Sequence, residues 1–367
     1  MLFLPLKNLR FFDWGLLAII LILISFSLII IYSLDLSQDN NFLFFKKQLV
    51  FILIGVLLFL GFSFVDYKIF NIYSYWFYLF SLLLLVGVLF FGEVIRGTKG
   101  WFVFGGLQFQ PVEMAKVALI IVLARFFSKK AYEIKKFQFI VLSGILLAPS
   151  LFLVLLQPDL GSAIVLFVLW FGMLLVSGIK KKHLFILILI LLVSFIFAWF
   201  FGFKDYQKDR LSTFLNPSSD PLGIGYNVIQ STIAVGSGGL LGQGVSHGSQ
   251  TQLQFLPEAH TDFIFASLAE AFGFLGVSLV LFFYGLFFYR IIKRLKNVRD
   301  DFAIFLVLGV LVYFIAQIFS NISMNVSMAP VMGLPLPLLS YGGSSLVVSL
   351  IMLGIVSNIL IKSEADK

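Results

Sequence analysis

The chain of 367 residues contains no cysteine, so disulfides, thiolate catalysis and zinc–thiolate sites are excluded. Charge is also scarce, because Asp, Glu, Lys and Arg make up 12% of the residues, against roughly 25% in soluble globular chains. The three histidines, His183, His247 and His260, are widely separated and do not favour a histidine-based metal cluster. Hydrophobic residues make up 60% of the chain, which predicts an integral membrane protein.

About ten mostly apolar runs are long enough to cross a bilayer, for which a helix needs about 20 residues. The predicted spans are 14–34, 48–65, 69–92, 111–127, 137–156, 160–179, 184–203, 262–289, 302–325 and 340–361. No segment between them is long enough to form a separate soluble domain. The sequence therefore predicts an all-α integral membrane protein with one polytopic domain over residues 1–367.

The distribution of positive charge predicts the orientation of the chain. With the amino terminus placed in the cytoplasm, 18 of the 26 Lys and Arg residues fall on inside segments and 7 on outside segments. Because basic residues mark the cytoplasmic side, both termini are predicted to be cytoplasmic. The longest loop, about 204–261, then lies on the extracytoplasmic side between the seventh and eighth spans. The net charge of +8 reflects this orientation and does not predict a nucleic-acid partner.

Glu113 and Lys116 lie three residues apart within a predicted span, just after Pro111. Ionisable groups inside a membrane are costly and are often functional. Their spacing places both side chains on one face of a helix, where they can form a pair. Two interpretations stay open at this point: a structural ion pair, and direct contact with a substrate.

The stretch LLQPDLGSA places Gln157 and Asp159 at a tight extracytoplasmic turn between two predicted spans. An Asp before a helix is a common N-cap, which is the structural interpretation. The alternative is that Asp159 lines an outward-facing cavity and contacts a polar ligand or a cation.

The stretch FLPEAHTDFIFASLAE places three ionisable residues, Glu258, His260 and Asp262, at the start of a predicted span. Each could cap the helix or interact with its dipole. Capping explains one acid better than the whole group, because Glu270 follows two turns later on a similar face. A carboxylate at the outer rim of a helix bundle can also act as a general base.

Two further segments are rich in glycine or proline. The stretch SGGLLGQGVSHGSQ (237–250) could be a flexible loop or, through its backbone N–H groups, a phosphate cradle. The stretch PLPLLSYGGSS (335–345) lies at membrane depth, where non-helical backbone must be buried in protein or line a cavity. It is predicted to form a re-entrant cavity wall, on which Ser340 and Tyr341 are candidate substrate contacts.

Several of these motifs resemble the SEDS family, named for shape, elongation, division and sporulation. The matching stretches are FQPVEMAK (109–116), QPDLGSA (157–163), the segment 205–244, FLPEAHTDFIFA (255–266) and GLPLPLLSYGGSS (333–345). They occur in the family's order. The GLPLP sequence at 333–337 is more similar to the RodA branch than to the FtsW division branch, which is the alternative.

The resemblance implies a ten-helix enzyme of the bacterial cytoplasmic (inner) membrane that polymerises lipid II into peptidoglycan glycan strands. It implies a class B penicillin-binding protein, elongation-complex membrane proteins and membrane lipid as partners. It also implies that Asp262 is the essential acid of the His-Thr-Asp motif. Glu113 and Lys116 match the glutamate of the family's Gln-Pro-x-Glu motif and the lysine that follows it.

The chain departs from the family pattern at basic positions near Trp101 and Gln108. If the family's arginines bind pyrophosphate, then either Lys99, Arg96 or Arg210 replaces them, or the affinity for pyrophosphate is lower. No dedicated metal site is predicted, although a divalent cation (Mg²⁺ or Mn²⁺) held by Asp262 or Asp159 would suit a diphosphate. Two other function classes compete with the polymerase: a lipid II flippase or transporter, which fits an intramembrane ion pair and proline-broken helices, and a non-catalytic scaffold.

Overall fold

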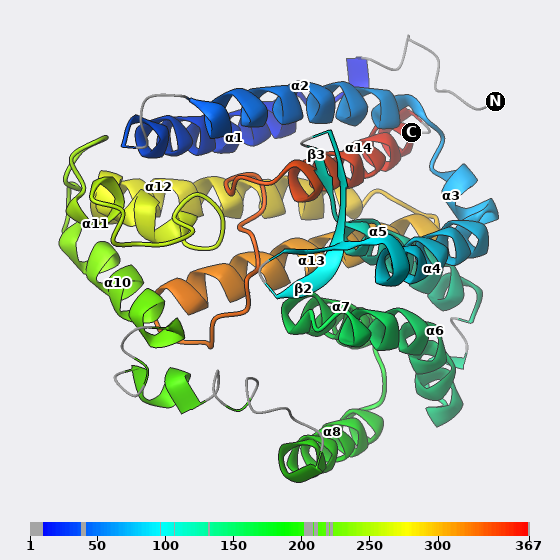
Figure 1. Ribbon diagram of the computed structural model, residues 1–367. Helices are drawn as coiled ribbons and strands as arrows, with labels where there is room; N and C mark the ends of the chain where they lie inside the picture. Colours follow the sequence, from blue (N-terminus) through cyan, green and yellow to red (C-terminus); the bar gives the residue numbers. More distant parts are fainter. Residues whose placement is uncertain are drawn as a thin grey trace.

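The computed structural model describes residues 10–37, 42–95, 97–105, 107–130, 133–201, 208, 212–217, 220 and 223–365. Long helices dominate it (Figure 1). In chain order the long helices are α1 (Trp14–Leu36), α2 (Leu43–Phe64), α4 (Ser74–Phe91), α5 (Pro111–Lys129), α6 (Phe137–Leu156), α7 (Leu160–Val176), α8 (Lys181–Phe201), α10 (Ile224–Ser237), α12 (Ile264–Leu295), α13 (Asp301–Asn325) and α14 (Gly343–Ala365). Two short helices, α3 (Lys68–Ile72) and α11 (Ser249–Gln252), lie between them.

Within the described residues, seven helices are long and apolar enough to cross a membrane: α1, α2, α4, α6, α12, α13 and α14. Many of their large apolar side chains, such as Phe80, Phe90 and Phe282, are exposed on the outside of the bundle. An exposed apolar surface of this kind suits contact with lipid tails. The prediction of an all-α membrane protein is confirmed, while the number of ten crossings stays a prediction.

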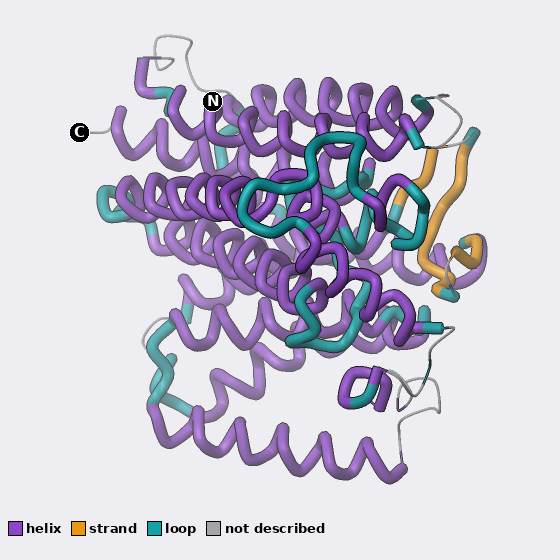
Figure 2. Tube along the Cα trace, turned by 90° about the vertical axis from the view of Figure 1, so that its left-hand side faces the viewer, coloured by secondary structure: helices purple, strands orange, loops and turns teal. Residues whose placement is uncertain are grey.

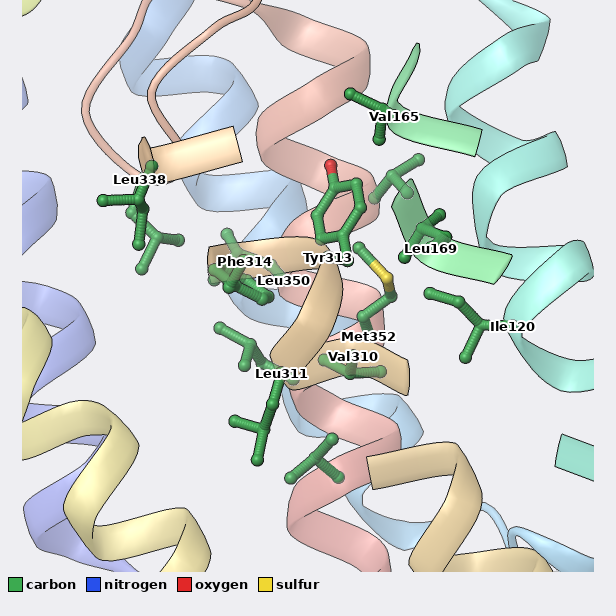
Figure 3. Packing of buried hydrophobic residues seen from close by; sticks show 14 of the residues in the cluster. Ile120, Val165, Leu169, Val310, Leu311, Tyr313, Phe314, Leu338, Leu350 and Met352 are labelled. Atoms are coloured by element: carbon green, nitrogen blue, oxygen red, sulfur yellow. The ribbon is translucent and has the colours of Figure 1, made fainter. Parts of the chain in front are cut away.

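The buried core forms where α5, α7, α13 and α14 meet. Figure 3 shows Tyr313 of α13 there, with Ile120 of α5, Leu169 of α7 and Met352 of α14 nearby. On the other side of α14 lies α2, which packs along it (Figure 1). Helix α5 is mostly buried, so it is an internal helix with little lipid-facing surface.

A small antiparallel sheet adds to the predicted helices. It consists of β1 (Glu93–Ile95), β2 (Thr98–Phe104) and β3 (Leu107–Phe109), with β2 in the middle. Glu93 pairs with Trp101, and Phe102 pairs with Phe109. The sheet joins α4 to α5, and therefore sets where α5 begins.

The first and last described parts of the chain both contact the end of α12. Asp13, before α1, forms ion pairs with Arg290 (2.8 Å) and Arg294 (3.2 Å) near the end of α12. Asn297, just after α12, donates a hydrogen bond to Glu364 near the end of α14 (2.9 Å). The described beginning and end of the chain therefore lie on the same side of the bundle, as the charge distribution predicts.

Helix α12 is broken at Gly273, which has φ 63° and ψ −164°. The glycine-rich segment before it pairs with the exposed backbone of the break. Gln243 N–H donates to the Glu270 carbonyl (2.9 Å), and Gly244 N–H donates to the Ala271 carbonyl (3.0 Å). In return, Phe274 N–H donates to the Gly239 carbonyl (2.9 Å). These N–H groups are committed to α12, which favours a structural role for this part of the segment over a phosphate cradle. Figure 2 shows the loops around α10 and α11 folded against the helices.

Candidate functional site

The chain entering α12 is held at every carbonyl from Glu258 to Asp262. The donors come from the stretch itself, from α12, from α13 and from the segment before α14. They are Thr261 and Phe263 N–H to Glu258, Ser267 Oγ to Ala259, Tyr341 N–H to His260, Ser340 Oγ to Thr261, and the amides of Asn321 and Asn325 to Asp262. The backbone that carries Asp262 is therefore fixed by hydrogen bonds within the protein.

Asp262 is half-buried and lies two residues before the first residue of α12. The N-cap residue is Phe263, which provides no side-chain hydrogen bond to the helix. Ala266 N–H in the first turn instead donates to Asn325 Oδ1 of α13 (3.1 Å). A Cβ atom placed on Gly333 would lie 3.6 Å from Asp262 Oδ2, so the carboxylate sits against the backbone of the segment between α13 and α14.

His260 and Glu258 lie on the same approach to the helix. His260 Nε2 is 4.0 Å from Glu258 Oε2, and Thr261 Oγ1 donates to the same carboxylate oxygen (3.0 Å). The His260 ring lies against Phe44, with ring centroids 4.3 Å apart, and meets Tyr341 edge-on at 5.6 Å. Both residues lie within four residues of Asp262 in the sequence, and their side chains contact protein neighbours. Their contact with a substrate stays a prediction.

Ser340 is buried and its hydroxyl is used within the protein. Ser340 Oγ donates to the Thr261 carbonyl (2.6 Å) and accepts a hydrogen bond from Leu336 N–H (2.8 Å). Tyr341 is half-buried and exposes more of its side chain. The segment predicted to be a re-entrant wall therefore lies against the entrance to α12, with Tyr341 the better placed of the two to meet a ligand.

Glu113 and Lys116 form the ion pair that their spacing predicts. Lys116 Nζ lies 2.7 Å from Glu113 Oε1, and the two side chains are 0% and 2% exposed. The Tyr313 hydroxyl donates to Glu113 Oε2 (3.3 Å), which ties α5 to α13. The predicted ion pair between the two side chains is confirmed. Direct contact of either side chain with a substrate stays a prediction.

Asp159 is the N-cap of α7, as one of the two interpretations predicts. Its Oδ1 accepts from Ser162 N–H (2.9 Å) and its Oδ2 accepts from Gln110 Nε2 (3.4 Å). Gln157 is buried, and its Nε2 donates to the Leu85 carbonyl of α4 (3.3 Å). Both residues hold the α6–α7 turn against neighbouring elements, and their contact with a ligand stays a prediction.

Of the candidate cations near the sheet, Lys99 lies in β2 opposite Val94 and is half-buried. Arg96 and Arg210 lie outside the described residues.

Comparison with known proteins identifies the family. A family model described as cell cycle protein, covering FtsW, RodA and SpoVE, matches residues 7–365. The chain belongs to this family.

Relatives in the FtsW, RodA and SpoVE family include proteins of all three branches. The chain is 35% identical over 347 residues to peptidoglycan glycosyltransferase MrdB of Escherichia coli (strain K12), covering 95% of this chain and 93% of that protein. It is 36% identical to stage V sporulation protein E of Bacillus subtilis (strain 168), covering 95% and 96%. It is 35% identical to the probable peptidoglycan glycosyltransferase FtsW of Trichlorobacter lovleyi, covering 95% and 93%.

Solved structures of the family have the same fold. One chain, from work on the structural coordination of polymerization and crosslinking by a peptidoglycan synthase complex, has a TM-score of 0.82 and 33% identity, covering 96% of this chain and 98% of its own. The rod shape determining protein RodA of Thermus thermophilus has a TM-score of 0.67 and 28% identity, covering 95% and 96%.

Glu270 does not join the Asp262 group in this family member. Its buried carboxylate accepts from Gln250 N–H (2.8 Å) and Thr251 N–H (3.1 Å) at the start of α11. The sequence suggested that Glu270 lies on a similar helical face to Asp262. In the structure its carboxylate contacts α11 instead, and it therefore joins α11 to α12.

A row of buried polar residues along α13 was not among the candidate site residues predicted from the sequence. Tyr313, Gln317, Asn321 and Asn325 follow each other at intervals of four and are all 0% exposed. Tyr313 contacts the ion pair, whereas Asn321 and Asn325 contact Asp262. These contacts are eight to twelve residues apart, or roughly 12–18 Å along the helix. The ion pair and Asp262 are therefore linked by α13 at different depths. The four-residue spacing within an uncharged run is the signal that could have revealed the row.

Among the described residues, no three His, Asp or Glu side chains gather in a way that could hold a metal ion. A divalent cation at Asp262 or Asp159 would need further ligands from the substrate, and it stays a prediction.

Proposed function

We propose that the chain is a peptidoglycan glycosyltransferase that polymerises lipid II into glycan strands. The observation that carries this proposal is Asp262, half-buried on a backbone fixed at every carbonyl from residue 258 to 262. The names of its relatives as peptidoglycan glycosyltransferases support the same activity. An acid held in this way is suited to one defined proton transfer.

In the proposed reaction, Asp262 acts as the general base. It takes the proton from the 4-hydroxyl of the GlcNAc of one lipid II molecule. The hydroxyl oxygen then forms a bond to C1 of the MurNAc of another, and the bond from C1 to the undecaprenyl pyrophosphate breaks. General-base assistance of this kind typically contributes 10²–10⁴-fold to the rate.

The departing pyrophosphate needs positive charge. Lys116 is fully buried and paired with Glu113, so it can meet a ligand only if this pair opens. Lys99 in β2 is half-buried and is the more accessible of these two lysines. We therefore assign leaving-group stabilisation to Lys99. Arg210 is a second candidate from the sequence alone, and Mg²⁺ or Mn²⁺ is an additional charge that the substrate would help to hold.

The physiological assignment is to cell elongation in the bacterial cytoplasmic membrane, with both termini in the cytoplasm. The RodA-like GLPLP stretch at 333–337 supports elongation over an FtsW-type division role. The proposed partner is a class B penicillin-binding protein, which is consistent with similarity to a chain of a peptidoglycan synthase complex. A flippase is less favoured, because Asp262 and Asp159 both lie at helix starts that the charge distribution places on the extracytoplasmic side.

The test uses the purified full chain, with a class B penicillin-binding protein, and labelled lipid II. We expect a ladder of glycan polymers from the unsubstituted chain and at least a hundredfold lower rate from Asp262→Asn, within the range for loss of a general base. Unchanged thermal stability in the variant would show that the protein is still folded. A normal rate and product length from Asp262→Asn would disprove the assignment of the base.

A further inference from the structure

Two asparagines of α13 hold the start of α12 in place. Asn325 Nδ2 donates to the Asp262 carbonyl (3.1 Å), and Asn325 Oδ1 accepts from Ala266 N–H (3.1 Å). One amide thus bridges the residue before the helix and its first turn. Because Phe263 provides no cap of its own, Asn325 supplies the cap from a neighbouring helix.

Asn321 lies one turn away on the same face of α13 and adds a second bridge. Its Nδ2 donates to the Asp262 carbonyl (2.9 Å) and to the Leu334 carbonyl (2.7 Å). Leu334 follows Gly333, the residue against which the Asp262 carboxylate lies. Asn321 therefore fixes both the backbone of the acid and the wall beside its side chain.

The two side-chain amides also contact each other. Asn325 Nδ2 donates to Asn321 Oδ1 (3.3 Å) and to the backbone carbonyl of Asn321 (2.8 Å). Ser231 Oγ of α10 donates to the backbone carbonyl of Asn325 (2.9 Å). Both asparagines are 0% exposed. Buried polar groups whose hydrogen bonds are all made hold one arrangement, because breaking any of them leaves a desolvated group without a partner.

We propose that Asn321 and Asn325 are positioning residues for Asp262, acting through its backbone carbonyl and through the start of α12. This inference rests on the proposed function, in which Asp262 is the general base. Neither side chain needs to touch the substrate. Their loss shifts the carboxylate away from the acceptor hydroxyl, and a misplacement of about 1 Å can cost on the order of a hundredfold in rate.

The kinetic test compares Asn321→Ala and Asn325→Ala with the matched control Asn358→Ala. Asn358 of α14 is also 0% exposed, and its amide also bridges two backbone groups, accepting from Tyr67 N–H (3.1 Å) and donating to the Ser63 carbonyl (2.9 Å). It does so at the α2–α3 turn, away from Asp262. The control therefore reproduces the loss of a buried amide without the contact to the acid.

We expect Asn321→Ala and Asn325→Ala to lower kcat per folded molecule at least tenfold, with KM for lipid II changed less than about twofold. Asn358→Ala should lose similar thermal stability and keep its kcat. If kcat falls in all three variants by an amount that follows the decrease in Tm, the role of the asparagines is structural and the proposal is wrong. If Asn325→Ala does not fold, the milder Asn325→Ser, which keeps a hydroxyl, takes its place.

A second measurement needs no substrate. Hydrogen exchange of a peptide covering 255–270 should become at least tenfold faster in the Asn321 and Asn325 variants and stay unchanged in Asn358→Ala. Unchanged exchange in all three would overturn the proposal even if activity falls. The absence of a polymer ladder from the unsubstituted chain would contradict the proposed function, and the exchange result would still show whether the asparagines fix this backbone.

Discussion

At the scale of single residues, buried polar groups of α5 and α13 connect the middle of the bundle to its candidate site. The Glu113–Lys116 pair is desolvated, so each charge depends on the other, and the Glu113 carboxylate also accepts a hydrogen bond from the Tyr313 hydroxyl. Removing one partner of a buried pair leaves an uncompensated charge, whereas replacing both by groups of similar shape is often neutral. This asymmetry separates a structural role from contact with a substrate.

Glu113→Gln and Lys116→Met should each lower the free energy of unfolding by about 3–5 kcal/mol, because each leaves one buried charge unpaired. The double variant should recover most of this loss. Thermal melting in detergent micelles measures the effect. Glu133→Gln is the control, since the Lys130–Glu133 pair is 37% exposed on each side and should contribute about 1 kcal/mol or less.

A double variant that stays as unstable as either single variant would contradict the structural interpretation of the pair. A stable but inactive double variant would support contact with the substrate, the alternative that the sequence left open.

At the scale of elements, α12 shows where local sequence stops predicting structure. The apolar run predicts one uninterrupted span over 262–289. Helix α12 covers this run from Ile264 onward, but Gly273 breaks it. The break is stabilised by residues 239–244, more than 25 residues earlier in the chain. Hydropathy does not predict this pairing, because the pairing is made by backbone groups, whereas hydropathy is a property of side chains. The i, i+3 spacing of Glu113 and Lys116, by contrast, is local, and it predicted their contact.

Gly273→Ala should destabilise the protein. An added Cβ would meet Gly242 N at 2.3 Å, and φ at this position is +63°. Backbone strain alone costs about 1–3 kcal/mol. Gly285→Ala in the same helix is the control, because its Cβ would meet nothing within 4 Å. The control should raise helix stability by about 0.5–1 kcal/mol. Equal melting temperatures for the two variants would show that the positive φ and close packing at Gly273 do not contribute to the stability of the protein.

At the scale of the whole molecule, hydropathy located the long helices but not their neighbours. The predicted spans overlap helices in the structure, because burial in lipid requires about 20 apolar residues wherever a helix crosses. The packing of α14 along α2 and the position of α5 inside the bundle were not predictable in this way. All of these helices are apolar on most faces, so their sequences do not state which face meets which partner. The Asp262 motif was predictable, whereas the asparagines that hold it belong to a helix some 60 residues later in the chain.

The ends of the two packed helices α2 and α14 are joined by an ion pair that should make stability depend on pH. Lys362 Nζ lies 2.8 Å from Asp66 Oδ2. Burial alone would raise the pKa of Asp66, but the hydrogen bonds from Lys362 and Lys68 and the positive charges of both lysines bring this pKa below its ordinary value of 3.8. A lowered pKa in the folded state gives stability that is present above pH 3.8 and is lost as the pH falls through the folded-state value.

The unsubstituted chain should therefore exceed Asp66→Asn in stability by on the order of 1 kcal/mol at pH 7, and the difference should shrink below about pH 4. Thermal melting of both proteins across this pH range measures the effect, and a difference that stays constant down to pH 3 would show that the Asp66 carboxylate is not stabilised by its ion pair with Lys362.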